Sequence, residues 1–371
     1  MVLALRDLDK FARLIVEYSA EVSKGDEVVI RFGVEALPFV RTLVKAIVER
    51  GGYPRLELID EETAEIFFKY ATREVLEYLS PIDKMIAEKI NVMISVISFS
   101  HTKYLVGVDP ERIKVRSAAT RELSEIFMRR DGEGSLKWTV TIYPTRALAQ
   151  EAGMSILDYE EFIYRALKLY AEDPVAHWRE IAAKQEKLAE RLSRISEIRV
   201  VDSDTDLTLS VAGRRWVNDD GKKNMPGGEV FTGPVEESVE GYIAFTYPSI
   251  WRGYEVEGVK LVFRRGEVVE ATAVKGEEFL KKMLETDEGA RRVGEFAFGL
   301  NYDIRRFTKQ ILLDEKIGGT IHLALGSGYH TTGSKNRSAI HWDMIKDTSK
   351  AKIYGDGDLI YENGRFLWEV L

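Results

Sequence analysis

The spacing of apolar positions predicts alternating strands and helices in the first half of the chain. Residues 27–32 and 92–99 are short apolar runs of the kind that form buried strands. Across residues 37–48, apolar side chains recur every three or four positions, as on one face of a helix. Strands that alternate with helices are typical of a parallel sheet covered on both faces. We therefore predict an α/β N-terminal domain with a mainly parallel sheet covered by helices.

The second half of the chain has a different pattern. After residue 196, short strand-like runs are separated by turns such as Arg264-Arg265-Gly266 and Asn363-Gly364, which are typical of antiparallel hairpins. Residues 158–196 are mostly helical in pattern and strongly charged, and we interpret them as a connecting helix. A chain of 371 residues is long for one hydrophobic core. We predict two domains, residues 1–196 and 197–371, of which the second is an α+β domain rich in antiparallel strands.

The composition argues against several classes of partner. The formal net charge is -8 and the basic residues form no block, which disfavours nucleic-acid binding. Neither a G-x-G-x-x-G nor a P-loop motif is present, so a nucleotide site has no support. The absence of cysteine removes disulfides and thiolate chemistry and fits a reducing compartment. No apolar run suits a signal peptide or a membrane span, so we expect a cytoplasmic protein with no membrane partner.

Candidate chemistry is concentrated near the C-terminus. Three of the five histidines, His322, His330 and His341, fall within residues 321–343. His341 and Asp343 are two positions apart, so on a strand their side chains point to the same side and can converge on one ion. This pair predicts part of a metal site that needs further ligands.

Two glutamates upstream are candidates for those further ligands. Glu295 lies among small and apolar residues, where a carboxylate is expected to be buried and to need a cation, a hydrogen-bond network or a proton. Glu229 follows the turn Pro226-Gly227-Gly228, which allows a ligand to approach the backbone closely. Each candidate also has an ordinary interpretation, as a surface carboxylate, a hydrogen-bonded core histidine or, for Tyr329, a packed aromatic residue.

Taken together, the candidates supply two glutamates, two histidines, an aspartate and a tyrosine. This set is too large for one tetrahedral zinc ion that also keeps an open position. It suits two divalent ions about 3.5–4 Å apart, bridged by a carboxylate and a water.

Several motifs resemble those of the M29 metallopeptidases, the family of thermophilic aminopeptidases. The matching motifs are Met225-Pro-Gly-Gly-Glu229, Gly294-Glu-Phe-Ala297, His322-x-Ala-Leu-Gly-x-x-Tyr329 and His341-x-Asp343. Residues 143–145 and 152–155 resemble that family's first domain, so the resemblance covers nearly the whole chain. It implies the following metal ligands: Glu229, Glu295, His322, Tyr329, His341 and Asp343. His330 departs from the family pattern, and we interpret it as an incidental surface residue.

The resemblance also implies an activity. It implies a metallo-aminopeptidase that releases N-terminal amino acids from short peptides by means of a water activated by two divalent metal ions (Zn, Co, Mn or Mg). The family further implies a homodimer and a first domain that shapes and covers the active site. We hypothesise that Glu295 bridges the two ions. A carboxylate near the water should carry the proton to the leaving amine: Glu295 is one candidate, although a carboxylate that binds metal is a poorer base than a free one. Tyr329 is a candidate to stabilise the oxyanion if it does not bind an ion tightly.

Two other classes of protein remain compatible with the same residues. One is a dinuclear metal hydrolase that acts on another amide or on a phosphoester. The other is a non-catalytic binding protein in which the metal ions are only structural. Turnover of aminoacyl-anilides, compared with phosphoesters, separates these classes.

Overall fold

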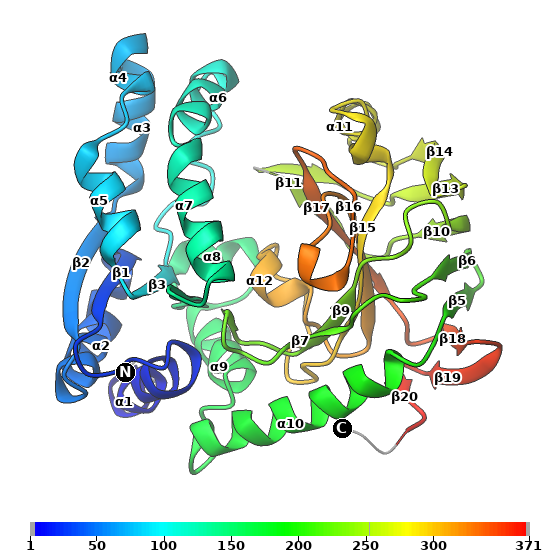
Figure 1. Ribbon diagram of the computed structural model, residues 1–371, viewed down its shortest axis with the longest axis horizontal. Helices are drawn as coiled ribbons and strands as arrows, with labels where there is room; N and C mark the ends of the chain where they lie inside the picture. Colours follow the sequence, from blue (N-terminus) through cyan, green and yellow to red (C-terminus); the bar gives the residue numbers. More distant parts are fainter. Residues whose placement is uncertain (1–3, 252, 369–371) are drawn as a thin grey trace. The chain divides into compact units, whose positions relative to one another are not determined.

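The computed structural model describes residues 4–251 and 253–368, and the chain divides into two compact units (Figure 1). One unit consists of Met1–His177 together with Gly221–Pro226. The other consists of Trp178–Asp220 together with Gly227–Leu371. A short segment from the second half of the sequence therefore belongs to the first unit.

The first unit is built on a parallel sheet with the strand order β2-β1-β3-β4-β8. Its central strands are the apolar runs seen in the sequence, and most of their side chains are buried. The returning segment supplies β8, which pairs with β4 in parallel register. The strands are β1 (Glu27–Gly33), β2 (Tyr53–Ile59), β3 (Val92–Ile97), β4 (Lys137–Ile142) and β8 (Asn224–Met225). The predicted α/β domain with a parallel sheet is confirmed.

Helices of the first unit begin where short polar side chains cap the backbone. Asp60, Thr145 and Ser155 each accept a hydrogen bond from the amide three residues later, which satisfies a donor that the helix leaves free. The helices are α1 (Ala4–Arg13), η1 (Leu14–Ser19), η2 (Val34–Ala36), α2 (Leu37–Glu49), α3 (Glu61–Tyr70), α4 (Arg73–Glu77), α5 (Pro81–Lys89), α6 (Pro110–Ala119), α7 (Arg121–Gly132), α8 (Arg146–Glu151) and α9 (Ile156–Ala166). Next along the chain is the long helix α10 (Pro174–Leu192).

The second unit contains two antiparallel sheets, as its turn-rich sequence predicts. The larger has the order β14-β13-β10-β6-β5-β18-β19-β20 and the other has the order β17-β16-β15-β9-β7. The larger sheet comprises β5 (Glu197–Asp202), β6 (Thr205–Ser210), β10 (Glu240–Ala244), β13 (Lys260–Arg264), β14 (Glu267–Thr272), β18 (Lys352–Gly355), β19 (Asp358–Glu362) and β20 (Arg365–Phe366). The other, which we call the ligand sheet, comprises β7 (Val217–Asp219), β9 (Glu229–Thr232), β15 (Val293–Gly299), β16 (Thr320–Gly326) and β17 (His341–Asp347).

The remaining elements of this unit are short. They are the hairpin of β11 (Ser249–Trp251) and β12 (Tyr254–Val256), with α11 (Glu277–Leu284), η3 (Glu288–Arg291), α12 (Ile311–Asp314) and η4 (His330–Thr332). The predicted α+β domain rich in antiparallel strands is confirmed. Among the residues that the structure describes, no helix is both long enough and apolar enough to cross a membrane.

The hydrophobic core of the second unit gathers one face of each sheet. Phe296, Leu323 and Trp342 from the ligand sheet belong to the same buried cluster as Leu207 and Phe263 from the larger sheet. Because side chains alternate along a strand, residues next to these in the sequence must lie on the other face of the ligand sheet. That second face carries the candidate chemistry.

One charged residue extends into the core side of the ligand sheet. Lys346 is 2% exposed, and its Nζ lies 3.1 Å from Asp202 Oδ2 and 2.9 Å from Asp204 Oδ1, both beside the larger sheet. This buried ion pair links strands β17 and β5. Its removal leaves the Asp202 carboxylate without its cation.

We expect Lys346→Met to lower the free energy of unfolding by about 3 kcal/mol, because breaking a buried ion pair leaves an uncompensated charge. Denaturant unfolding, followed by a spectroscopic signal from the second unit, measures this loss. Lys352→Met is the matched control, since Lys352 pairs with Glu362 at 3.2 Å on the surface, where such pairs contribute about 0–1 kcal/mol. Equal losses in the two variants would contradict the account.

Candidate metal centre

The predicted ligands lie on the face of the ligand sheet that is turned away from the core. In the register of the strands, Glu295 is opposite Ala324, and Ala324 is opposite Asp343. Residues paired across antiparallel strands share a face, so the two carboxylates flank a single methyl group. Ala324 leaves the space between them open, and a larger side chain there would fill it.

The same arrangement recurs at the other candidates. Glu229 is opposite Gly299, His322 is opposite Ala297, and His341 is opposite Gly326. Alanine and glycine beside each of these side chains leave room around them on this face of the sheet. The small residues that surround Glu295 in the sequence thus have a structural reason.

An irregularity in β15 directs Glu295 toward the others. The register of β15 against β16 shifts between Val293 and Glu295, as in a β-bulge. Gly294 occupies the bulge, and a Cβ there would lie 2.4 Å from the Gly326 carbonyl oxygen. Only glycine fits, so the bulge and the aim of Glu295 depend on it.

The Glu295 carboxylate lies at the centre of the cluster. Its Oε1 is 3.1 Å from His322 Nε2, and its Oε2 is 3.7 Å from His341 Nε2. Each oxygen therefore faces a different imidazole. His322 Nε2 is also 3.7 Å from Glu229 Oε2, and His341 Nε2 is 3.6 Å from Asp343 Oδ1.

These distances fit the ligand shell of a divalent ion. Around a tetrahedral ion with bonds of about 2.1 Å, neighbouring ligand atoms are about 3.4 Å apart. His341 Nδ1 lies 2.7 Å from the Ser327 carbonyl oxygen, so Nδ1 carries a hydrogen and Nε2 is the ring nitrogen available to an ion. Orientation of a ligating histidine by a backbone carbonyl is common in metal sites.

Several polar atoms of the cluster have no hydrogen-bond partner within the described part of the chain. They are Glu229 Oε2, Asp343 Oδ1 and His322 Nδ1, all of them buried. A buried polar atom without a partner costs roughly 1–3 kcal/mol. Glu229 and Asp343 therefore offer free oxygens, and carboxylate and imidazole donors are those that divalent ions prefer. The residues present fit divalent metal ions.

The pKa values of the metal-free cluster also fit a metal site. Burial disfavours the charged imidazoles, but hydrogen bonding to Glu295 and the nearby carboxylates outweigh it and raise the pKa of His322 to about 9. At His341, burial lowers the pKa, but the charges of Asp343 and Glu295 outweigh this effect and raise the pKa to about 9. Burial raises the pKa of Asp343 to about 6, against the opposing effect of His341. Bound protons thus occupy ligand atoms for which a metal ion competes.

Tyr329 lies beside the cluster on the loop that follows β16. Its ring packs 5.2 Å from the His341 ring and 5.4 Å from the Phe231 ring, measured between centroids. The residue as a whole is half exposed. Burial of the hydroxyl, together with the charges of Glu295 and Asp343, raises its pKa. The phenol is therefore protonated and able to donate a hydrogen bond.

Polar contacts hold the Tyr329 loop in place. Asn336 donates from Nδ2 to the Gly326 carbonyl oxygen at 2.6 Å. Glu236 accepts a hydrogen bond from the Lys335 amide at 2.6 Å and pairs with Arg214 at 2.5 Å. The position of Tyr329 thus depends on side chains outside the predicted ligand set.

His330 takes no part in the cluster. It lies in η4, is exposed, and belongs to neither of the groups of side chains that could hold an ion among the described residues. The structure thus brings together Glu229, Glu295, His322, His341 and Asp343, places Tyr329 against them, and leaves His330 apart.

The structure adds three residues that the sequence reasoning did not single out. Glu315 joins Glu229 and His322 in one group of potential ligand atoms, all within 4.8 Å of one another. A second group with the same limit contains Glu295, His322 and Asp343. Beside the first group lie Lys316, which is fully buried, and Asp219. The sequence does mark Glu315 and Lys316, because Asp314-Glu315-Lys316 is a charged triplet between apolar residues.

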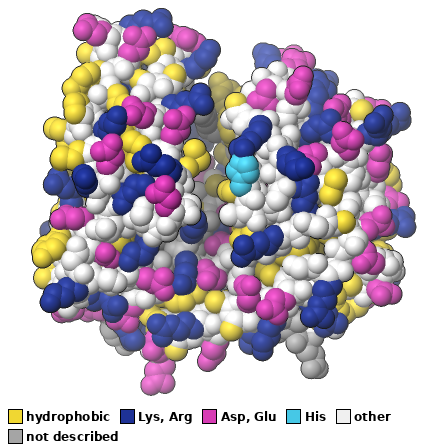
Figure 2. All heavy atoms as spheres, viewed as in Figure 1, with side chains coloured by type: hydrophobic (Ala, Val, Ile, Leu, Met, Phe, Trp, Pro, Cys, Tyr) yellow, Lys and Arg dark blue, Asp and Glu magenta, His cyan; other side chains and the backbone are white. Residues whose placement is uncertain are grey.

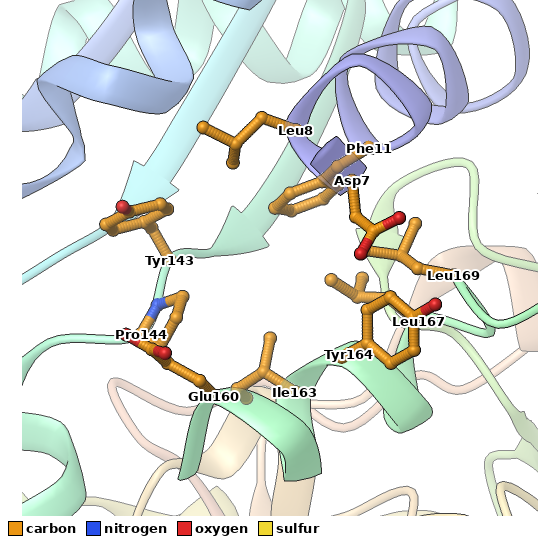
Figure 3. A pocket seen from close by; sticks show the side chains of 10 residues that line it. All are labelled: Asp7, Leu8, Phe11, Tyr143, Pro144, Glu160, Ile163, Tyr164, Leu167 and Leu169. Atoms are coloured by element: carbon orange, nitrogen blue, oxygen red, sulfur yellow. The ribbon is translucent and has the colours of Figure 1, made fainter. Parts of the chain in front are cut away.

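A small cavity in the first unit is separate from this cluster (Figure 3). It measures about 50 Å³ and is lined mainly by apolar side chains, among them Phe11, Tyr143, Ile163 and Leu167. None of the candidate ligands lines it. The face of the molecule drawn in Figure 2 carries acidic and basic side chains interspersed.

Comparison with known proteins assigns the class and then the family. The class is that of the metalloproteases, which are metal-dependent hydrolases of peptide bonds. The family is the one described as thermophilic metalloprotease (M29), whose sequence model matches residues 5–366. The chain belongs to this family, and the family predicted from the motifs is confirmed.

Relatives resemble the chain over nearly its whole length. Aminopeptidase AmpS of Bacillus subtilis is 29% identical, with 97% of this chain and 98% of that protein covered. Aminopeptidase T of Thermus thermophilus is 28% identical, with 97% of this chain and 96% of that protein covered. The solved structure of wild-type AmpT from Thermus thermophilus matches with a TM-score of 0.84 at 27% identity, over 98% of this chain and 99% of that one. The predicted enzyme class, a metallo-aminopeptidase, is confirmed by these comparisons.

Proposed function

We propose that this metal-dependent aminopeptidase releases N-terminal amino acids from short peptides with two divalent ions on the face of the ligand sheet that carries the candidate ligands. The observation that carries the proposal is the position of Glu295, whose two oxygens face different imidazoles at 3.1 Å and 3.7 Å. A carboxylate placed in this way suits a bridge between two ions. The ions would be held by Glu229, Glu295, His322, Tyr329, His341 and Asp343, with Glu315 as an additional ligand.

The charge of the cluster supports two ions in preference to one. When ionised, the carboxylates of Asp219, Glu229, Glu295, Glu315 and Asp343 carry five negative charges against the one ammonium of Lys316. The difference of four equals the charge of two divalent ions. Buried charges are stable only when they are compensated.

Divalent ions, when bound, lower the pKa of water from 15.7 toward about 7 and polarise a carbonyl oxygen. The protein's own groups complete the chemistry. Glu295, 4% exposed and central in the cluster, is the carboxylate placed to take the proton of the attacking water and pass it to the leaving amine. The hydroxyl of Tyr329, where it does not bind an ion tightly, would donate a hydrogen bond to the oxyanion that develops on the scissile carbonyl.

The remaining parts of the proposal follow the family. The first domain restricts access, so that only short peptides reach the second, catalytic domain. The protein works as a homodimer in the cytoplasm. Zn, Co, Mn and Mg all accept this set of oxygen and nitrogen ligands, so the native ion is the one that the cell supplies.

A substrate panel tests the proposed function. The protein is stripped with a chelator, reloaded separately with each of the four ions, and assayed on leucyl-anilide, N-acetyl-leucyl-anilide and a phosphoester. We expect metal-dependent turnover of leucyl-anilide alone, because the free α-amine defines an aminopeptidase substrate. Equal turnover of the acetylated compound, or turnover of the phosphoester only, would replace the proposal with another hydrolase activity.

A further inference from the structure

A buried lysine lies at one side of the candidate centre. Lys316 is fully buried directly after Glu315, close to the end of α12. Its Nζ lies 3.3 Å from Asp219 Oδ2 and 3.7 Å from Glu229 Oε1, and it bonds to the Glu315 carboxylate. Three carboxylates from β7, β9 and the turn after α12 therefore surround one ammonium.

The lysine is associated with only one of the two groups of potential ligands. Glu229 and Glu315, which form one group with His322, are both paired with it. In the other group, Glu295 and Asp343 pair with histidines, and within residues 4–251 and 253–368 no lysine or arginine pairs with either of them. The two halves of the centre thus differ in whether a cation is already present.

An ammonium and a divalent ion compete for the charge of the same carboxylates. Two like charges a few ångströms apart repel strongly where water is excluded. An ion that enters the half formed by Glu229 and Glu315 must share both carboxylates with Lys316, through oxygens such as Glu229 Oε2 that the ammonium does not contact. Asp219 belongs to neither group of ligands and then remains as the partner of the lysine.

We propose that Lys316 is a built-in counter-ion that makes the two halves of the metal centre unequal. The half containing Glu295, His341 and Asp343 fills first and tightly. The half containing Glu229 and Glu315 fills second and weakly, because the ion must share its carboxylates with the ammonium of Lys316, which repels it. This inference rests on the proposed two-metal function and deepens it, since activity then depends on the free concentration of the second ion.

Lys316 also explains how the metal-free protein keeps this half of the centre ordered. Without a cation, Asp219, Glu229 and Glu315 would repel one another in a buried environment. With the lysine in place, the carboxylates are held near the positions in which they receive an ion. The weaker affinity comes from competition with the ammonium and outweighs the gain from having the carboxylates already in position.

A calorimetric titration of the metal-free, full-length protein with Mn²⁺ tests the inference. Wild type should bind two ions in separable steps. In Lys316→Met the second step should tighten at least tenfold, while the first should change by less than about threefold, since Lys316 pairs with carboxylates of one half only. The metal-free variant should also melt at a lower temperature than wild type and recover when Mn²⁺ is added.

Lys346→Met is the matched control. Lys346 is also a buried lysine paired with two carboxylates, but it lies on the core side of the same sheet. We expect it to lower the melting temperature without changing either binding step. Lys316→Gln provides a second neutral variant that retains a polar end, and it should show the same tightened second step even if Lys316→Met folds poorly.

The outcomes separate this inference from the proposed function. An unchanged or weakened second step in the folded Lys316 variants overturns it, because the lysine then does not compete with the ion. The inference is also overturned if Lys346→Met tightens the second binding step as much as the Lys316 variants do. Two bound ions in wild type without peptide turnover would overturn the proposed activity and leave the binding result to be judged on its own.

Discussion

Glu295→Gln should lower kcat/KM on a leucyl peptide by about a thousandfold or more at saturating metal, within the range of about 10²–10⁴ that a positioned acid–base group contributes. The amide removes the negative charge at the centre of the cluster and cannot carry the proton to the leaving amine. Its shape is nearly that of the carboxylate, so the packing of β15 is preserved. Steady-state kinetics on the folded variant provide the measurement.

Asp202→Asn is the control for this prediction. Asp202 is a largely buried carboxylate of the same unit that pairs with Lys346, on the other side of the ligand sheet. The control should lose stability and keep activity within about threefold of wild type, because it touches none of the candidate ligands. A Glu295→Gln protein with full metal-dependent activity would remove Glu295 from the mechanism.

His341→Ala should reduce metal-dependent activity by at least about a hundredfold and lower the number of bound ions, because His341 Nε2 faces both Glu295 and Asp343. His341 is preferable to His322 for this test, since its side chain is 29% exposed and its truncation leaves a smaller cavity. Metal content after dialysis and activity with re-added metal measure the two effects.

His330→Ala is the matched control within the same segment. His330 is exposed and belongs to neither group of potential ligands. We expect its metal content to be unchanged and its activity to remain within about twofold of wild type. Loss of metal in both variants, or in His330→Ala alone, would contradict the assignment of ligands.

The sequence predicts the two architectures because their patterns are distinct. The apolar runs at β1 and β3 lie buried at the centre of a parallel sheet, and the hairpin turns of the second half connect antiparallel strands. Boundaries were harder to predict. Residues 110–132 form two helices, α6 and α7, with the Thr120 hydroxyl bonded back to the Arg116 carbonyl oxygen at the break between them.

Much of the cluster could also be predicted, for local reasons. His341 and Asp343 lie on one side of β17 because side chains two apart on a strand share a face. The burial of Glu295 followed from its small and apolar neighbours. Both features depend only on residues that lie close together in the sequence.

The rest of the cluster depends on contacts between distant segments. Glu315 follows the four-residue helix α12 and reaches Glu229 and His322 only through the folded arrangement of the loops. The pairing of Lys316 with Asp219 joins residues almost a hundred positions apart. Likewise, the pairing of β8 with β4 takes a short segment of the second half back into the first unit. No periodicity in the sequence encodes these contacts.

The central claim is that one face of the ligand sheet holds two divalent ions bridged by Glu295. Anomalous X-ray diffraction from crystals of the protein loaded with Zn²⁺ tests it most directly. The account predicts two anomalous peaks about 3.5–4 Å apart on either side of the Glu295 carboxylate. A single peak, or peaks away from this face of the sheet, would contradict it.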